Sequence, residues 1–167
     1  MEFTLPVNMR NIIKMARIVA VCTNSERGSP KKPMRQGLLR ENYGLVGDAH
    51  AGSTRQVSLL AIESINKMLR ALKSINPDRM HSQGVVVNPG DSAENLVTEG
   101  VDLLSLSPGT RIYMGEEAVL EITEIGKEFH RPGFYLLPLE GVFARVIHGG
   151  IVKPGDNLNL HSSKSRA

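Results

Sequence analysis

The hydrophobic positions of this chain fall mostly in short runs, and one longer run has helical spacing. Arg17–Thr23 (RIVAVCT) is rich in β-branched residues and predicts a strand. Arg55–Leu60 (RQVSLL) predicts a second, short strand that leads into a helix over Ala61–Ile75. The apolar residues of this helix lie three, four and three positions apart, which keeps them on one face. They are Ile62, Ile65, Leu69 and Leu72. The helix is expected to end at Asn76, because a residue before proline disfavours the α region.

Proline–glycine turns divide the rest of the chain. NPGD (88–91), SPGT (107–110) and KPGD (153–156) favour type II turns, since proline presets φ and glycine accepts a positive φ. Arg111–Met114 and Ala118–Ile125 predict a hairpin, and NLNLH (157–161) predicts a further strand. Many short strands with one substantial helix predict a mainly β fold with short helices, of the α+β class. We expect it to form a closed or nearly closed β-barrel, because closure removes exposed strand edges.

The length of 167 residues fits a single domain. Folded structure is expected to begin at MARIVAV, so residues 1–14 are interpreted as a flexible extension, 15–161 as the domain and 162–167 as a disordered tail. No apolar stretch reaches the roughly 20 residues that cross a bilayer. The first residues also lack the apolar core of a secretory signal. We therefore expect no membrane association.

Cysteine content and charge narrow the function classes. The single cysteine, Cys22, excludes a disulfide within the chain and suits the cytoplasm. Residues 1–40 carry eight Lys or Arg against two Asp or Glu, whereas residues 91–128 carry two against nine. The basic segment predicts either a small anionic ligand or a solvated face balanced by the acidic segment. Nucleic acid is not expected, because the chain has no tryptophan and few aromatic side chains for base stacking.

A glycine-rich loop is the first candidate site. In GLVGDAHAGSTRQ (44–56) the glycines allow backbone amides to approach a ligand, and His50 and Arg55 add side-chain donors. The spacing matches no known phosphate motif, so a purely structural turn remains an alternative.

Other polar positions give less specific signals. Asp91, Glu94 and Asn95 lack the spacing of a calcium loop, and no histidines are paired as zinc ligands, so no metal site is predicted. Cys22 alternates with Ile18 and is expected to be a small residue of the barrel interior.

Cationic residues follow and interrupt two later apolar runs. Lys127, His130 and Arg131 lie together after a predicted strand, where they predict an anion contact or a solvated turn. Arg145 interrupts the apolar run VFARVI and needs a partner, either a structural carboxylate or a ligand. Spacing alone does not separate these alternatives.

Six segments, in order, resemble the MOSC domain, which is named from the C-terminal domain of molybdenum cofactor sulfurase. They are SERGSPKKP, GLVGDAHAG, RQVSLLAIESI, PGDSAENLVTEGVDLLSLSPGTRIYMG, AVLEITEIGKE and EGVFARVIHGGIVKPGD. The resemblance implies a β-barrel of the pyruvate-kinase type and a role around the molybdenum cofactor or sulfur transfer. The pyridoxal phosphate associated with this family belongs to a separate aminotransferase-like domain, so none is expected in this chain.

One departure from the family pattern bears on chemistry. The family typically reads GKxC after the long hairpin strand, whereas this chain reads GKEFH, with Phe129 in the position of the cysteine. Phenylalanine can neither carry a persulfide nor ligate molybdenum, since both need a thiolate. A catalytic residue therefore remains unknown, and His130 and Cys22 are the candidates.

The resemblance also implies that the candidate ligand residues converge on one anion-binding mouth suited to a pterin phosphate. These residues are His50, Arg55, Asn95, Lys127 and Arg145. Three functions stay open. The first is a module that binds molybdopterin or a related anion, with a molybdoenzyme or a sulfur-transfer protein as partner. The second is an enzyme of sulfur transfer or of N-hydroxylated compound detoxification that uses another residue. The third is an interaction domain with a vestigial site.

Overall fold

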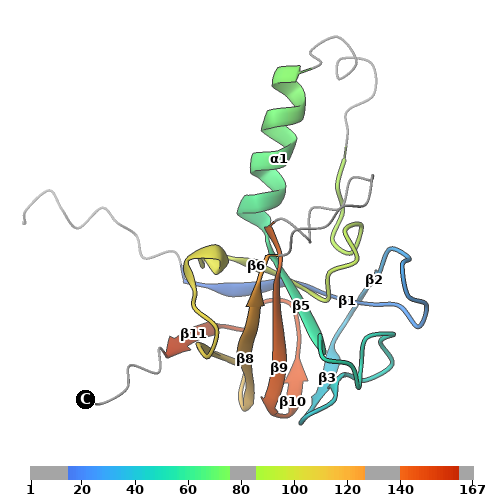
Figure 1. Ribbon diagram of the computed structural model, residues 1–167, viewed down its shortest axis with the longest axis vertical. Coiled ribbons are helices and arrows are strands. Elements are labelled where there is room, and N and C mark those ends of the chain that lie inside the picture. Colours follow the sequence, from blue (N-terminus) through green and yellow to red (C-terminus); the bar gives the residue numbers. More distant parts are fainter. Residues whose placement is uncertain (1–14, 76–85, 127–139, 162–167) are drawn as a thin grey trace, which may run out of the picture.

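The computed structural model describes residues 15–75, 86–126 and 140–161 (Figure 1). The predicted extension (1–14) and tail (162–167) lie outside the described residues. The elements are β1 (Arg17–Thr23), β2 (Lys32–Met34), β3 (Gly37–Arg40), β4 (Gly44–Leu45), β5 (Val57–Ala61), α1 (Ile62–Ile75), β6 (Leu96–Glu99), the 3-10 helix η2 (Leu103–Ser105), β7 (Arg111–Met114), β8 (Ala118–Ile125), β9 (Val142–His148), β10 (Gly150–Val152) and β11 (Leu158–His161). Among them, no helix combines the length and apolar character needed to cross a bilayer.

The elements with strong local signals lie where the sequence predicts them. β1, β7 and β8 have the predicted bounds, and α1 begins one residue later than expected. The glycines of the three Pro-Gly turns all have positive φ angles: 93° at Gly90, 90° at Gly109 and 93° at Gly155. These values fit the third position of a type II turn.

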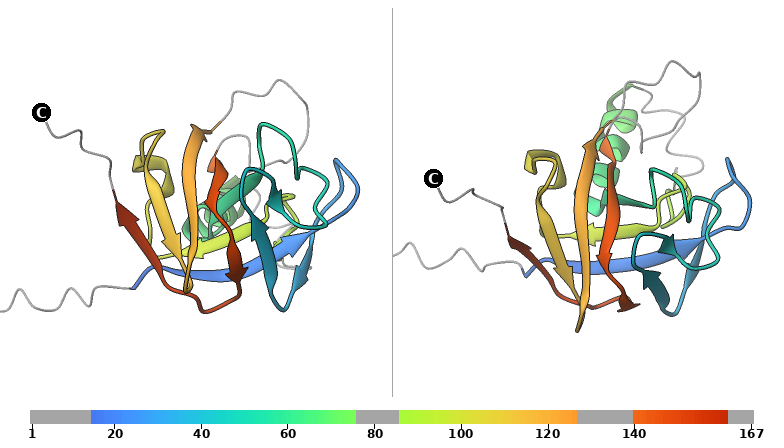
Figure 2. Two further views of the ribbon diagram at one scale, coloured as in Figure 1. Left: turned by 90° about the horizontal axis from the view of Figure 1, so that it is seen from below. Right: turned by 60° about the horizontal axis from the view of Figure 1, so that its bottom comes forward.

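The strands form two sheets. The larger has eight strands in the order β11-β7-β8-β9-β5-β6-β1-β2, and the smaller has the order β10-β3-β4. α1 connects the parallel strands β5 and β6, while the neighbouring pairs β5–β9 and β1–β6 are antiparallel. The large sheet is strongly curved, so that β1 and β6 run across β8 and β9 (Figure 2). The fold is therefore mainly β, with one α-helix among the described residues and a large mixed sheet.

The expected closed barrel is not confirmed. One antiparallel bridge joins Arg17 to Asn157, and the Leu158 amide donates to the Ala16 carbonyl over 2.9 Å. Within the described residues this contact does not extend into a ladder between β1 and β11. The sheet therefore approaches closure at one point, and along the rest of the β11 edge no neighbouring strand is found in the part of the chain that the structure describes.

The curved sheet has a hydrophobic cluster on each face. The larger cluster fills the concave interior and includes Val21, Leu59, Leu120 and Val146. The smaller lies under the first half of α1; its buried members are Ala20, Cys22, Leu60, Ile65 and Val97. Cys22 is thus on the α1 side and not in the interior as predicted. A bulge between Ile18 and Ala20 shifts the alternation of β1 and moves Cys22 to the other face.

Candidate functional site

The glycine-rich loop over 44–52 is held by its own backbone hydrogen bonds. Five of its amides donate to backbone carbonyls over 2.7–3.2 Å, those of Val46, Asp48, Ala49, Ala51 and Gly52. The His50 amide donates to Oδ2 of Asp48 over 3.0 Å. These donors are used within the fold, so the loop does not offer them to a ligand as the sequence suggested. Its backbone instead fixes where the His50 side chain lies.

A buried ion pair supports this loop. Nζ of Lys31 lies 2.6 Å from Oδ1 of Asp48, and the two side chains are 1% and 0% exposed. Burial opposes ionisation of Asp48, but hydrogen bonds from Lys31 and from the amides of His50 and Asn24 outweigh it and lower the pKa of this carboxyl. Neither residue is predicted as a site residue from the sequence, because the two lie 17 positions apart and nothing local indicates their pairing.

His50 lies over this ion pair, with its side chain 37% exposed. Its Nδ1 is 3.4 Å from Nζ of Lys31 and 3.6 Å from Oδ2 of Asp48. Burial lowers the pKa of His50, the positive charges of Lys31 and Arg27 lower it further, and Asp48 opposes them. The ring is therefore neutral at neutral pH. Because the ammonium of Lys31 can only donate, we assign Nδ1 as the acceptor and place the ring proton on Nε2.

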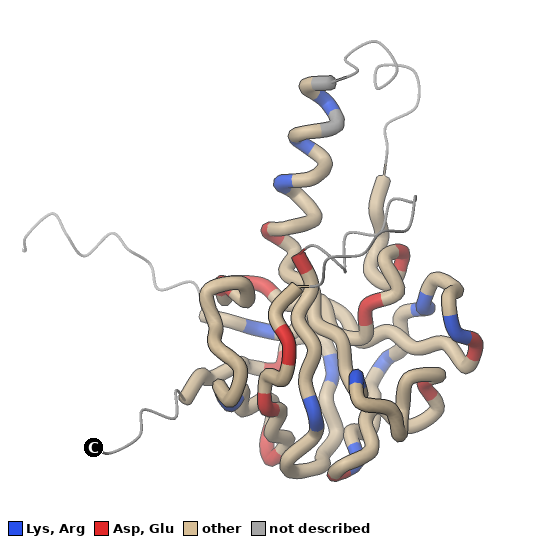
Figure 3. Tube along the Cα trace, viewed as in Figure 1, with Lys and Arg blue, Asp and Glu red and all other residues tan. Residues whose placement is uncertain are grey.

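An exposed arginine lies beside His50. Nε of Arg27 donates to the Ala49 carbonyl over 3.3 Å, and Arg27 has no carboxylate partner among the described residues. Figure 3 shows the wider setting: many basic residues lie on the side of β2 and the loop before it, whereas acidic residues gather along β8 and the turn before it. We call Arg27, Lys31, Asp48 and His50 the His50 site. It presents one cation and one neutral ring donor to solvent.

Cys22 lies near the His50 site but has no thiolate character. Its side chain is completely buried, and burial, followed by the nearby Glu94, raises its pKa to about 12. Glu94 is itself fully buried: Oε1 accepts from the Gly90 amide over 2.6 Å, and Oε2 has no partner among the described residues. Burial also raises the pKa of Glu94. These surroundings disfavour Cys22 as a nucleophile.

Cys22 is expected to react slowly with a disulfide reagent such as DTNB in the native protein. At neutral pH few molecules carry the thiolate, and access requires opening of the cluster under α1. Labelling should accelerate strongly when guanidinium unfolds the same sample. Native labelling as fast as that of the unfolded chain would return Cys22 to the candidate nucleophiles.

Asn95 has a structural position. Its Oδ1 accepts from the amide and the hydroxyl of Ser58 over 3.0 and 3.1 Å, and its Nδ2 donates to the Cys22 carbonyl over 3.2 Å. The side chain is buried and joins β1 to β5. Its polar groups are therefore engaged in the fold.

Arg55 and Arg145 are bound to carboxylates of β8. Arg55 makes a two-pronged contact with Glu124 over 2.9 and 3.0 Å. Arg145 contacts Oε1 of Glu121 through Nε and Nη2 over 3.1 and 2.7 Å. In β9 the residues on either side of Arg145 are buried while Arg145 is exposed, so it lies on the outer face of the sheet. The structure thus favours the ion-pair alternative for Arg145.

The predicted convergence on one mouth is not confirmed. Lys127, Phe129, His130 and Arg131 lie outside the described residues. Of the predicted ligand residues that the structure does describe, Arg55 and Arg145 are held by carboxylates and Asn95 is engaged in the fold, whereas Nε2 of His50 has no partner among the described residues. Within the same part of the chain, no group of three or more His, Cys, Asp or Glu is arranged to hold a metal ion.

The fold is similar to solved structures. The YuaD protein from Bacillus subtilis matches with a TM-score of 0.67 and 22% identity, over 90% of this chain and 98% of that chain. YiiM from Escherichia coli matches with a TM-score of 0.60 and 18% identity, over 87% of this chain and 70% of that one. YiiM from Geobacillus stearothermophilus matches with a TM-score of 0.60 and 15% identity, over 91% and 78%. No protein-family model and no curated protein matches the chain. At these identities the likeness shows the fold alone, and it supports the MOSC-like fold that the sequence motifs imply.

Proposed function

We propose that this protein is a binding module of the MOSC type that takes a small anionic ligand at the His50 site. The observation that carries the proposal is the neutral His50 ring, oriented by a buried Lys31–Asp48 pair and placed beside the exposed Arg27. A buried ion pair is weak evidence for stability, because apolar side chains of similar volume often stabilise a core equally well. Its presence here is explained by the orientation it gives to the loop and to the ring.

The donors of this site fit one part of a molybdenum cofactor. A guanidinium and a ring N–H are suitable partners for the phosphate of a molybdopterin-type ligand. A protein thiolate for molybdenum does not fit, since the single cysteine is buried and its pKa is raised to about 12. We therefore propose that the chain holds the phosphate end. The metal of the bound cofactor would supply any redox chemistry.

The expected partner and location follow from this proposal. A module that binds such a ligand without a reactive thiol would deliver it to a molybdoenzyme or to a sulfur-transfer protein. We place it in the cytoplasm, because a free, unpaired cysteine suits a reducing compartment.

Replacing His50 or Arg27 with alanine is expected to weaken binding of a pterin monophosphate about 10- to 100-fold each. A hydrogen bond to a charged group contributes roughly 1.5–3 kcal/mol, and about 1.4 kcal/mol corresponds to a tenfold change. Isothermal titration calorimetry with a pterin monophosphate and with inorganic phosphate measures the effect. Arg145→Ala is the control for Arg27→Ala, since it removes the same charge from the outer sheet face and should leave affinity unchanged.

Two results would contradict the proposal. If Arg145→Ala weakened binding as much as Arg27→Ala, the effect would be one of overall charge and not of a site. If the wild-type protein bound neither probe, the His50 site would not be an anion site at all.

One observation favours a second candidate function. Arg145 is held by Glu121 on an outer face, as expected of an interaction domain whose ancestral site is vestigial. The enzyme alternative through Cys22 has no such support, because that side chain is buried.

A further inference from the structure

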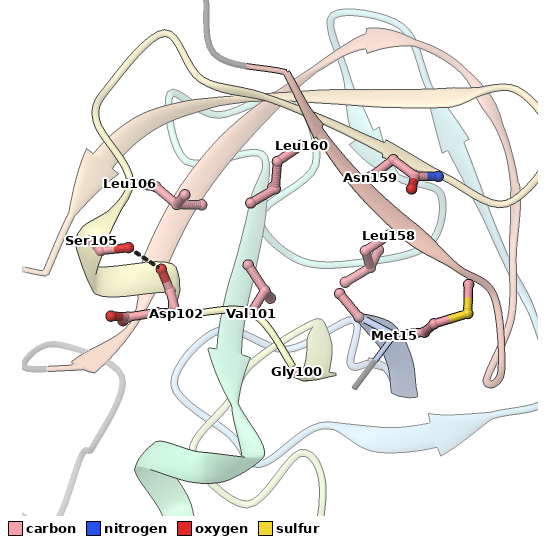
Figure 4. Close-up of a pocket in the computed structure, with 10 residues that line it drawn as sticks. Met15, Gly100, Val101, Asp102, Ser105, Leu106, Leu158, Asn159 and Leu160 are labelled. Carbon is pink, nitrogen blue, oxygen red and sulfur yellow. Dashed lines mark hydrogen bonds between the residues drawn. The ribbon is translucent and has the colours of Figure 1, made fainter. Parts of the chain in front are cut away.

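The sheet leaves a groove where it fails to close. A pocket of about 450 Å³ lies between the start of β1, η2 and the edge strand β11 (Figure 4). Its apolar lining includes Met15, Val101, Leu106, Leu158 and Leu160. Figure 4 shows these side chains arranged around a common space, with Asp102 at its border. The groove belongs to a different part of the fold from the His50 site.

The backbone of β11 faces this groove with unused hydrogen-bonding groups. The Asn157 carbonyl accepts from the Gly115 amide over 3.2 Å, on the side of β7. The next residue, Leu158, donates to the Ala16 carbonyl over 2.9 Å, on the opposite side. Because successive residues of a strand direct their backbone groups to alternate sides, the N–H and C=O of Leu160 point away from β7. Neither group has a partner among the described residues.

The side chains around this free edge define what would bind there. Leu160 is 41% exposed and Met15 is 64% exposed, so apolar surface lies open beside the free backbone groups. Asp102 is exposed, and its carboxylate makes no hydrogen bond or ion pair with the described residues. A free strand edge, an apolar hollow and an unpaired acid together suit an extended segment with apolar and basic residues.

We propose that this groove binds an extended peptide segment of a partner protein, which adds to β11 as a further strand. The segment hydrogen-bonds to the backbone of Leu160, places an apolar side chain in the hollow and sets a Lys or Arg against Asp102.

Selection of heptapeptides from a random phage-displayed library on the full-length protein tests this inference. Selected peptides are expected to alternate apolar residues and to carry a Lys or Arg. Their affinities are then measured by fluorescence polarisation with labelled synthetic copies. Leu160→Pro removes the free N–H at a strand edge, where proline is tolerated, and should weaken binding about 3- to 10-fold.

Two further variants and one control separate the contributions of the Leu160 side chain and of the Asp102 charge from that of the backbone hydrogen bond. Leu160→Ala keeps the backbone N–H and measures the contribution of the side chain alone. It therefore still tests the groove if the proline variant fails to fold. Asp102→Asn should weaken binding about 3- to 10-fold at low salt and less at high salt. Leu38→Ala is the control, because it removes an exposed leucine of similar exposure (49%) on β3.

The proposal is overturned if selected peptides bind equally well to wild type, Leu160→Ala and Asp102→Asn. It is also overturned if sedimentation shows a dimer of the full chain that Leu160→Pro dissociates, because a second copy would then occupy the edge. Weakened binding in the groove variants, with Leu38→Ala unchanged, supports it.

Discussion

Replacing Asp48 with asparagine is expected to lower the free energy of unfolding by about 3–5 kcal/mol at neutral pH. Asparagine keeps a single acceptor oxygen, so it can accept from the amide of Asn24 or from that of His50 but not from both, and it removes the negative charge that faces Lys31. The Lys31 side chain is 1% exposed, so its charge would remain buried without compensation. Breaking a buried ion pair from one side has costs of this size. Chemical denaturation followed by circular dichroism measures the difference.

Measuring the loss of stability in Asp48→Asn at several pH values tests whether the charge of the Asp48 carboxylate causes it. The pKa of Asp48 in the folded protein lies below its ordinary value of 3.8. Its stabilising contribution is therefore complete above that ordinary value and is lost as the pH falls through the folded-state pKa. The difference in the free energy of unfolding between wild type and Asp48→Asn should therefore become smaller at acid pH. A difference that stayed constant with pH would show that the loss comes from altered packing and not from the lost charge.

A second substitution gives a matched control for the buried charge. Adding Lys31→Met to Asp48→Asn removes the uncompensated ammonium and should recover part of the lost stability. Arg145→Ala breaks an exposed ion pair and should cost no more than about 1 kcal/mol. If Asp48→Asn cost as little as Arg145→Ala, the buried pair would not be the support of the loop that we describe.

Gly90→Ala is expected to destabilise the fold by about 4 kcal/mol or more. A Cβ atom at this position would overlap the carbonyl oxygen of Lys31, and it would lie 3.4 Å from Sγ of Cys22. The φ angle of 93° is also one that alanine rarely adopts. Costs of this size are exceptional for single substitutions and come from strain of this kind.

A substitution at Gly155 is the control that measures the cost of the backbone conformation without the steric overlap. It has the same φ angle of 93°, yet a Cβ atom there would meet no atom within 4 Å. Gly155→Ala should therefore cost only the conformational part, about 1–2 kcal/mol. Equal losses in the free energy of unfolding in the two variants would show that the turn at Gly90 shifts to accommodate the added methyl group.

Local signals in the sequence predicted the elements that local physics determines. β-branched residues predicted β1, apolar spacing predicted α1, and Pro-Gly pairs placed three turns with glycines at positive φ. The three-residue strand β2 and the two-residue strand β4 carry no comparable pattern. Their pairing depends on neighbours elsewhere in the chain. The bulge in β1 was equally invisible, although it decides which face Cys22 occupies.

The candidate site was predicted only in part, for a related reason. His50 was recognised from its loop, but its orientation depends on Lys31, which approaches from 19 positions earlier. Arg145 was ambiguous until the β8–β9 register placed it opposite Glu121, 24 positions away. Partners of this kind are set by tertiary structure, which a single sequence does not display.

The meeting of Arg17 with Asn157 has a consequence for synthesis on the ribosome. The first strand described, β1, pairs with β6, and its start bonds to the residues just before β11, about 140 positions later. Neither contact can form until most of the chain has emerged. Folding dominated by such distant contacts is slow, and the waiting strand exposes apolar surface in the meantime. β1 is thus a segment that needs protection while the nascent chain is incomplete.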